Sequence, residues 1–186
     1  MPNKIEYSDH EIVTLLKSGS ETAIDIMFKK YYTYLCRAVM RIVPDPNLAE
    51  DIVQDVFYDI WRKRETINIK STLQGYLKRA AVNKTLNYIR AKKMKFSDID
   101  KMPETKEKNI NALEGIQNKE LEKTIHVAIE NLPEKCRIVF CLSRFEEMSH
   151  QEISDELGIS KKTIENHISK ALRILRKVVE SYKNLE

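Results

Sequence analysis

The sequence predicts an all-α protein made of two small helical domains. Apolar residues recur at spacings of three and four along most of the 186-residue chain, and only four Gly and five Pro interrupt them. No run of alternating residues indicates a strand. The segment 97–118 is rich in Lys, Glu, Asp and Asn, which is the composition of a flexible linker. We therefore expect a first domain over 1–96, a linker over 97–118 and a second domain over 119–186.

The first two helices are bounded by capping and breaking residues. Ser8 with Glu11 forms a capping-box pattern, so a short amphipathic helix is expected to start there and to end near Gly19. A second helix is expected to begin near Ser20. Its apolar positions recur at three and four until Pro44-Asp45-Pro46 breaks the pattern.

Two further helices complete the first domain and differ in charge. Asn47 with Glu50 is expected to cap the third helix, which has a broad apolar face. Ser71 is expected to open a long fourth helix. Positions 42–61 hold five acids and no base, whereas positions 66–97 hold eight Lys or Arg and no acid. One segment is therefore acidic and its neighbour basic, which predicts different partners for the two helices.

The third helix carries an acidic stripe. Four residues are expected to share one of its faces: Asp51, Gln54, Asp55 and Tyr58. The helix dipole favours acids near the N-terminus, which accounts for Asp51 but not for Asp55. Paired carboxylates also suggest metal or acid-base chemistry, but the four His lie elsewhere, at positions 10, 126, 150 and 167. The stripe therefore indicates a binding surface more than a catalytic one.

The fourth helix is predicted to present a polar, cationic face without balancing acids. Five residues fall on it at spacings of three and four: Tyr76, Arg79, Asn83, Asn87 and Arg90. A face of this kind favours a polyanion as partner. Tyr76, with the flanking Tyr88 and Phe96, suits stacking on unpaired bases. The alternative is that these aromatic residues are core and the cations only keep the helix solvated.

The second domain ends in a predicted helix-turn-helix. A helix starting near Leu121 stops at Pro133, and another follows directly. Ser149 and Glu152 form a capping-box pattern for a short helix that ends at Gly158, where a left-handed backbone is cheapest. Ser160 then caps a long helix with apolar residues at spacings of four. The small residues Ser154 and Gly158 and the apolar Ile164 stand at the spacing that lets two helices cross closely around a tight turn.

The last helix has the charge and the side chains expected of a DNA-reading helix. The short helix before it is acidic, whereas its own exposed face mixes cations with groups able to read base edges: Lys161, Lys162, Thr163, Asn166, Ser169, Lys170 and Arg173. The alternative is that its basic end only complements the helix dipole. Turn, spacing and charge together favour DNA binding.

The remaining composition predicts a cytoplasmic protein without a metal or cofactor. Charged residues interrupt the first twenty positions, and no apolar run approaches the roughly 20 residues of a membrane-spanning helix. Cys36, Cys136 and Cys141 lie among apolar residues, which predicts buried thiols. A Cys-x4-Cys pair without a second pair or a correctly spaced His is weak support for zinc.

Taken together, these segments resemble the extracytoplasmic-function (ECF) class of RNA polymerase sigma factors. The stretch 48–57 with Trp61 resembles the family segment that docks on the β′ clamp helices of the polymerase. The stretch 75–90 resembles the helix that, with the loop before it, opens and reads the −10 promoter element. Leu132-Pro133 with Arg137, followed by 145–158, resembles the domain that reads the −35 element and touches the β flap.

The resemblance implies an alternative sigma factor that binds core RNA polymerase and promoter DNA, with no catalysis and no small-molecule substrate of its own. It implies the −10 role for the fourth helix and the −35 role for the last one. It also implies a membrane-associated anti-sigma partner. The chain departs from the family pattern in two places: Glu165-Asn166-His167 stands where Lys-Ser-Arg is frequent, and Asn87 stands where Asp is frequent.

Two other functions are compatible with parts of the sequence. The stretch 163–169 also resembles the output domains of response regulators, so a conventional transcriptional regulator is one alternative. Such proteins usually carry a receiver or ligand domain with strands in the first half, and no strand pattern is found here. A helical metal-dependent hydrolase built on Glu50, Asp51 and Asp55 is the other, and metal analysis would test it.

Overall fold

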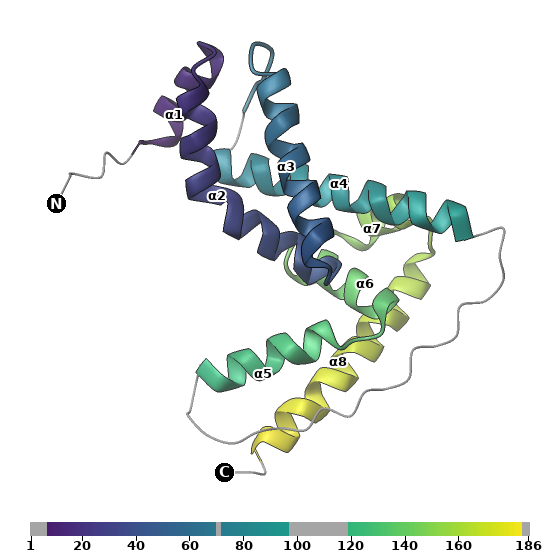
Figure 1. The fold of residues 1–186 in the computed structure, drawn as a ribbon. Coiled ribbons are helices and arrows are strands. Elements are labelled where there is room, and N and C mark those ends of the chain that lie inside the picture. Colours follow the sequence, from purple (N-terminus) through teal and green to yellow (C-terminus); the bar gives the residue numbers. More distant parts are fainter. Residues whose placement is uncertain (1–6, 70–71, 97–118, 184–186) are drawn as a thin grey trace. The chain divides into compact units, whose positions relative to one another are not determined.

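The computed structural model describes residues 7–69, 72–96 and 119–183, and every regular element in those ranges is a helix (Figure 1). The predicted all-α fold class is confirmed. The chain divides into two compact units, Met1–Ile89 and Arg90–Glu186. The predicted linker at 97–118 lies outside the described residues, and the predicted domain limits at 96 and 119 stay predictions.

The first unit opens with two helices joined by a glycine turn. Helix α1 spans Asp9–Lys17, and Ser8 and Glu11 form the predicted capping box before it. Gly19 has a φ of 77°, a left-handed conformation in which a side chain would be strained. Helix α2 then spans Glu21–Ile42. Ser20 precedes it as predicted but makes no capping hydrogen bond with its side chain.

The starts of the next two helices differ from the predictions. Helix α3 spans Pro46–Arg62, and its cap is Asp45, whose carboxylate accepts a hydrogen bond from the Leu48 amide at 3.2 Å. The predicted Asn47–Glu50 cap is therefore wrong, because Pro46 can occupy the first helical position without needing its missing N–H. Helix α4 spans Leu73–Phe96 and so begins later than the predicted opening at Ser71.

The core of the first unit lies where α2 and α3 pack together, with α1 and α4 adding to it. Three helices contribute side chains that are almost fully buried: Met27, Leu35 and Val39 of α2, Val53 and Val56 of α3, and Leu77 and Ala81 of α4. Each buried aliphatic side chain stabilises the fold by roughly 1.5–3 kcal/mol. Trp61, half-buried at the end of α3, packs on this core, and the Arg64 guanidinium lies 4.7 Å from its ring centre.

Among the described residues, four helices lie wholly in the second unit: α5 Lys119–Glu130, α6 Glu134–Arg144, α7 His150–Leu157 and α8 Lys161–Lys183. Helices α5, α6 and α7 all pack against α8. The buried Arg137 of α6 donates hydrogen bonds to the carbonyls of Glu130 at 3.0 Å and Leu132 at 3.3 Å. This side chain therefore supplies hydrogen-bond donors to carbonyls that lack an intrahelical partner at and just after the end of α5, and it holds this segment against α6.

The turn between α6 and α7 has an unusual backbone. Glu147 has a φ of 54°, the one non-glycine residue with positive φ in the described part of the chain. The turn is fixed on either side, because the amide of Glu146 bonds to the Cys141 carbonyl at 3.2 Å and that of Met148 to the Leu142 carbonyl at 3.0 Å. Glu147 must therefore adopt a conformation that disfavours its side chain.

The cysteine prediction is confirmed for two of the three thiols. Cys136 and Cys141 of α6 are buried, whereas Cys36 of α2 is only half-buried. Burial raises the pKa of both Cys36 and Cys136, so these thiols stay protonated at neutral pH.

Candidate functional site

The acidic stripe predicted on α3 forms one exposed face. Asp51, Gln54, Asp55 and Tyr58 are all exposed, whereas the residues between them on the other faces are buried. Tyr58 is the most exposed large apolar side chain among the described residues, with 63% of its surface accessible. Because the broad apolar face is buried, this strip of α3 is open to a partner.

The stripe shares a cation with α4, which the sequence did not reveal. The Lys84 ammonium lies 2.9 Å from an Asp59 carboxylate oxygen and 3.3 Å from one of Asp55. The hydrogen bond from Lys84 lowers the pKa of Asp59. Asp55 nevertheless keeps 69% of its side chain accessible. The pairing depends on how two helices pack, so only the two acids four residues apart could have hinted at it.

The polar face predicted on α4 is largely exposed. Arg79, Asn83, Asn87 and Arg90 are exposed, and Tyr76 is half-buried against the core of the first unit. For Tyr76 the alternative prediction, a core aromatic residue, is therefore partly right. Tyr88, 39% exposed, is more accessible for stacking. The side chain of Phe96 lies outside the described residues.

The second unit contains the predicted helix-turn-helix. Ser149 and Glu152 form the predicted capping box of α7, and Gly158 ends that helix with φ 63° and ψ 37°. The Ser154 hydroxyl donates to the Ile159 carbonyl at 2.8 Å and so closes the turn. Ile153 of α7 and Ile164 of α8 are completely buried. The two helices are therefore held by an apolar contact on one side and a capped turn on the other.

Helix α8 presents most of the predicted DNA-reading residues to solvent. Six of them are exposed: Lys161, Lys162, Asn166, Ser169, Lys170 and Arg173. The last four of these line one shallow hollow of about 270 Å³. Cations and amide or hydroxyl groups therefore alternate on one surface, an arrangement that suits phosphates and base edges.

Two residues near the start of α8 face away from that surface. Thr163 is half-buried, its amide donates to the Ser160 hydroxyl at 3.1 Å, and the two hydroxyls lie 2.8 Å apart. Its side chain therefore supports the helix cap more than it reads a base. His167 is half-buried, with Nδ1 3.5 Å from the Cys136 sulfur of α6. Burial, aided by Lys135 and Lys170, lowers the pKa of His167.

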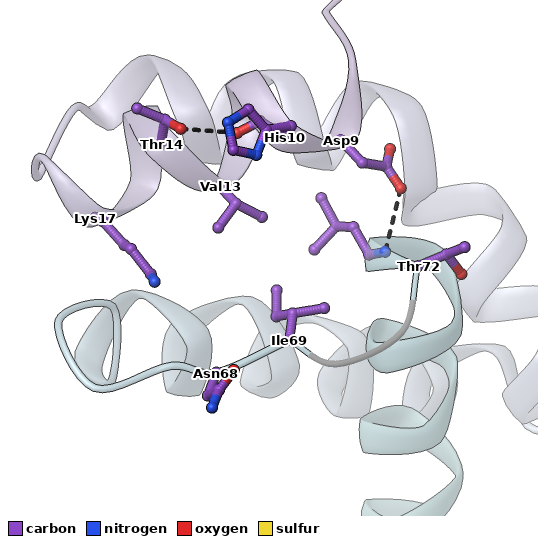
Figure 2. A pocket seen from close by; sticks show the side chains of 9 residues that line it. Asp9, His10, Val13, Thr14, Lys17, Asn68, Ile69 and Thr72 are labelled. Atoms are coloured by element: carbon purple, nitrogen blue, oxygen red, sulfur yellow. Dashed lines mark hydrogen bonds between the residues drawn. The ribbon is translucent and has the colours of Figure 1, made fainter.

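A pocket of about 560 Å³ opens beside the start of α4 (Figure 2). Asp9, His10, Thr14 and Lys17 of α1 line one side, and Asn68, Ile69 and Thr72 line the other. This pocket could not be predicted from the sequence, because its two sides come from segments more than fifty residues apart. In the described ranges no helix is long and apolar enough to cross a membrane, and no three His, Cys, Asp or Glu side chains gather as metal ligands would.

These features define a class of protein: a helical DNA-binding protein whose first unit carries an acidic stripe and whose second unit carries a helix-turn-helix. Residues 27–94 match the family model described as sigma-70 region 2, and residues 122–175 match that described as sigma-70, region 4. The chain belongs to the sigma-70 family of RNA polymerase sigma factors, in the ECF class. It is an alternative sigma factor that directs promoter recognition and transcription initiation.

Curated relatives agree with this family over nearly their whole length. The RNA polymerase sigma-H factor of Pseudomonas aeruginosa is 26% identical over 181 residues, which cover 92% of this chain and 94% of the relative. The ECF RNA polymerase sigma-E factor of Escherichia coli strain K12 is 26% identical over 175 residues, covering 89% of this chain and 91% of the relative.

Two solved structures resemble the chain more weakly. CnrH in complex with the cytosolic domain of CnrY aligns with a TM-score of 0.49 and 19% identity, over 93% of this chain and 97% of that one. The sigma factor RpoE in complex with the anti-sigma factor NepR from Bartonella quintana aligns with a TM-score of 0.48 and 18% identity, over 84% and 96%.

Proposed function

We propose that three exposed surfaces divide the work of this sigma factor. The acidic stripe of α3 binds the β′ clamp helices of core RNA polymerase, the polar face of α4 opens and reads the −10 element, and α8 reads the −35 element. The observation that carries the proposal is that the acidic surface and the two cationic surfaces lie on exposed faces of different helices. Opposite charges on separate faces allow protein and DNA to be bound at once.

Charge and exposure support the docking role of α3. Asp51 and Asp55 are exposed carboxylates with the exposed amide of Gln54 between them, so a basic helical partner would find both charge and hydrogen-bond acceptors. Tyr58 adds an accessible aromatic ring at the end of the stripe. Aromatic anchors beside charged groups are typical of binding hot spots.

Docking can be tested with a charge reversal and a matched control. Asp51→Lys should weaken binding to core polymerase about tenfold, because it replaces an attractive charge with a repulsive one. Asp55→Asn should weaken binding less, and it avoids placing a second ammonium beside Lys84. Glu21→Lys makes the same charge change on exposed α2 surface and serves as the control. Equal binding by Asp51→Lys and Glu21→Lys would refute the docking role.

The −10 role of α4 predicts the opposite pattern. Replacing Asn83 and Arg90 by Ala should leave the affinity for core polymerase unchanged and should lower the fraction of promoter opened. The reason is that exposed amide and guanidinium groups are removed from the DNA-facing helix while α3 is untouched. Core pull-down and open-complex footprinting on the same preparation separate the two effects.

The −35 role of α8 is tested by Lys170→Glu and Arg173→Glu. Both should weaken binding to a −35-dependent promoter, and the difference from wild type should shrink as salt rises because phosphate contacts are screened. Lys123→Glu, on exposed α5 surface of the same unit, is the matched control. Unchanged transcription from such a promoter by the folded variants would contradict the assignment.

The proposal also covers the β flap as a contact of the second unit and an anti-sigma factor as a regulatory partner. We infer that the chain acts in the cytoplasm, where polymerase and promoter are found, and has no enzymatic activity, metal or cofactor of its own. The conventional regulator is disfavoured, because residues 27–94 match a sigma-70 region in the half where a receiver or ligand domain would lie.

A further inference from the structure

Two side chains cap the first turn of α4: the adjacent Thr72, and Asp9 of α1. The Thr72 hydroxyl accepts a hydrogen bond from the Gly75 amide at 3.1 Å. The Leu73 amide donates to the Asp9 carboxylate at 3.1 Å, across 64 positions of sequence (Figure 2). The first amides of a helix have no partner within it, and a negative charge at that end is favourable. Asp9 therefore supplies the acceptor that α4 lacks.

Two residues of α2 hold the Asp9 carboxylate in place. Its other carboxylate oxygen accepts from the Tyr31 hydroxyl at 2.6 Å and from the Lys30 ammonium at 3.1 Å. Tyr31 is almost completely buried, so it offers a fixed donor. Burial acts to raise the pKa of Asp9, but the hydrogen bonds from Tyr31, Lys30 and the Leu73 amide outweigh it and lower that pKa. The carboxylate is thus ionised at neutral pH and fixed on both oxygens.

The first turn of α4 leads directly into its polar face. Tyr76 donates its amide to the Thr72 carbonyl at 3.0 Å, and Arg79 follows one turn later. We propose that Asp9 is a positioning residue for promoter opening: by holding the Leu73 amide it fixes the direction in which α4 presents Tyr76 and Arg79 to DNA. This inference rests on the proposed −10 role of α4. Asp9 lies outside the stretch that matches sigma-70 region 2, which begins at residue 27.

The chain offers a control for a purely stabilising role. Ser8, beside Asp9, caps α1 through its bonds with Glu11, at 3.3 Å from the Glu11 amide and 2.7 Å from its carboxylate. Ser8→Ala therefore weakens α1 without removing the bond to Leu73. Asp9→Asn keeps an acceptor oxygen but loses the charge that strengthens the bonds from Leu73, Lys30 and Tyr31. Tyr31→Phe loosens Asp9 while leaving its bond to Leu73, and it serves if Asp9→Asn folds poorly.

The test uses holoenzyme assembled from the full chain and core polymerase, on a promoter fragment that the wild type opens. Opening is followed by 2-aminopurine fluorescence in the −10 element, on duplex DNA and on the same fragment with the −10 segment pre-melted. Asp9→Asn should open the duplex about tenfold more slowly, as expected for weakening a charged hydrogen bond. On the pre-melted fragment it should match wild type within about twofold, and its core affinity should be unchanged. Tyr31→Phe should slow opening less.

The results that would overturn the inference are distinct from those that would overturn the −10 role. If Asp9→Asn opens duplex DNA at the wild-type rate, or if Ser8→Ala slows it equally, Asp9 has no positioning role. A defect of Asp9→Asn that persists on pre-melted DNA also overturns it. If Asn83 and Arg90 can be replaced without effect while Asp9→Asn still slows opening, the chosen face of α4 is wrong but the positioning by Asp9 stands. Hydrogen exchange at Leu73 should accelerate in Asp9→Asn and not in Ser8→Ala.

Discussion

His167 lies on the helix that carries the proposed −35 residues, yet its ring faces Cys136 of α6. The family pattern often has Arg at this position, and the sequence alone predicted no role for His167. Its lowered pKa makes it a neutral packing residue at neutral pH. The cations among the proposed −35 residues of α8 lie elsewhere, at Lys161, Lys162, Lys170 and Arg173, and all four are exposed.

The second unit should therefore lose stability in mild acid. Because the folded pKa of His167 lies below its ordinary 6.5, the unfolded chain binds a proton more readily. The stabilisation from neutral His167 is complete when the pH is above the ordinary pKa of 6.5, and it declines as the pH falls below 6.5. In His167→Gln the decline between pH 7 and pH 5 should be shallower. Hydrogen exchange of α6 and α8 at both pH values measures it, and parallel slopes for the two proteins would contradict the expectation.

The strained backbone of Glu147 predicts a substitution that increases stability. A residue with a Cβ costs about 1–2 kcal/mol in the left-handed region. Replacement by Gly removes this cost, but the greater conformational entropy of Gly in the unfolded chain offsets part of the gain. Glu147→Gly should therefore stabilise the second unit by about 0.5–1 kcal/mol. Chemical denaturation gives the change, with Glu146→Gly as the control, which should destabilise. No gain for Glu147→Gly would mean that the Glu147 side chain makes compensating contacts.

Helix ends were predicted well where the sequence holds a capping box, and less well where two neighbouring residues compete for the cap or where the acceptor comes from another helix. The Ser8–Glu11 and Ser149–Glu152 boxes are local patterns, and both occur as predicted. The start of α3 was misplaced because Asp45 competes with Asn47 for the same role. The Asp9 contact that caps α4 could not be predicted, since it depends on how α1 packs near the start of α4.

Arg137 shows how one side chain can join two helices. Its guanidinium is buried and donates to the carbonyl of Glu130, the last residue of α5, and to that of Leu132 in the turn that follows. Arg137→Met should destabilise the second unit by about 2–3 kcal/mol, because the carbonyls lose a charged donor. Arg137→Lys should recover only part of this, since an ammonium lacks the planar fork. Thermal unfolding of the full chain checks the order, and equal stability of the Met variant and wild type would contradict it.

At the scale of the whole molecule, periodicity and composition predicted an all-helical chain in two parts. Both inferences rest on patterns summed over many residues, so single errors at helix ends did not affect them. The three candidate surfaces were likewise found from spacing, because residues three and four apart share a helix face whatever the tertiary packing. The inward positions of Thr163 and His167 and the Asp55–Lys84 pair required the packed structure.

We predict that the two parts of the chain fold independently. Composition places the connection at 97–118, so limited proteolysis of the free protein should cut there first. The fragments 1–96 and 119–186 should then each retain helical circular dichroism after separation. Early cleavage within α3, or loss of helicity in either fragment, would contradict the predicted division.

Trp61 provides an intrinsic fluorescence signal. It is the only tryptophan of the chain, and it lies half-buried in the unit that carries the acidic stripe. Its emission therefore reports on that unit alone, while circular dichroism reports on every helix. Two melting curves that do not coincide would mark separate unfolding transitions without any label or mutation. The same ring lies one helical turn beyond Tyr58, so a change in its emission when core polymerase is added would signal docking directly.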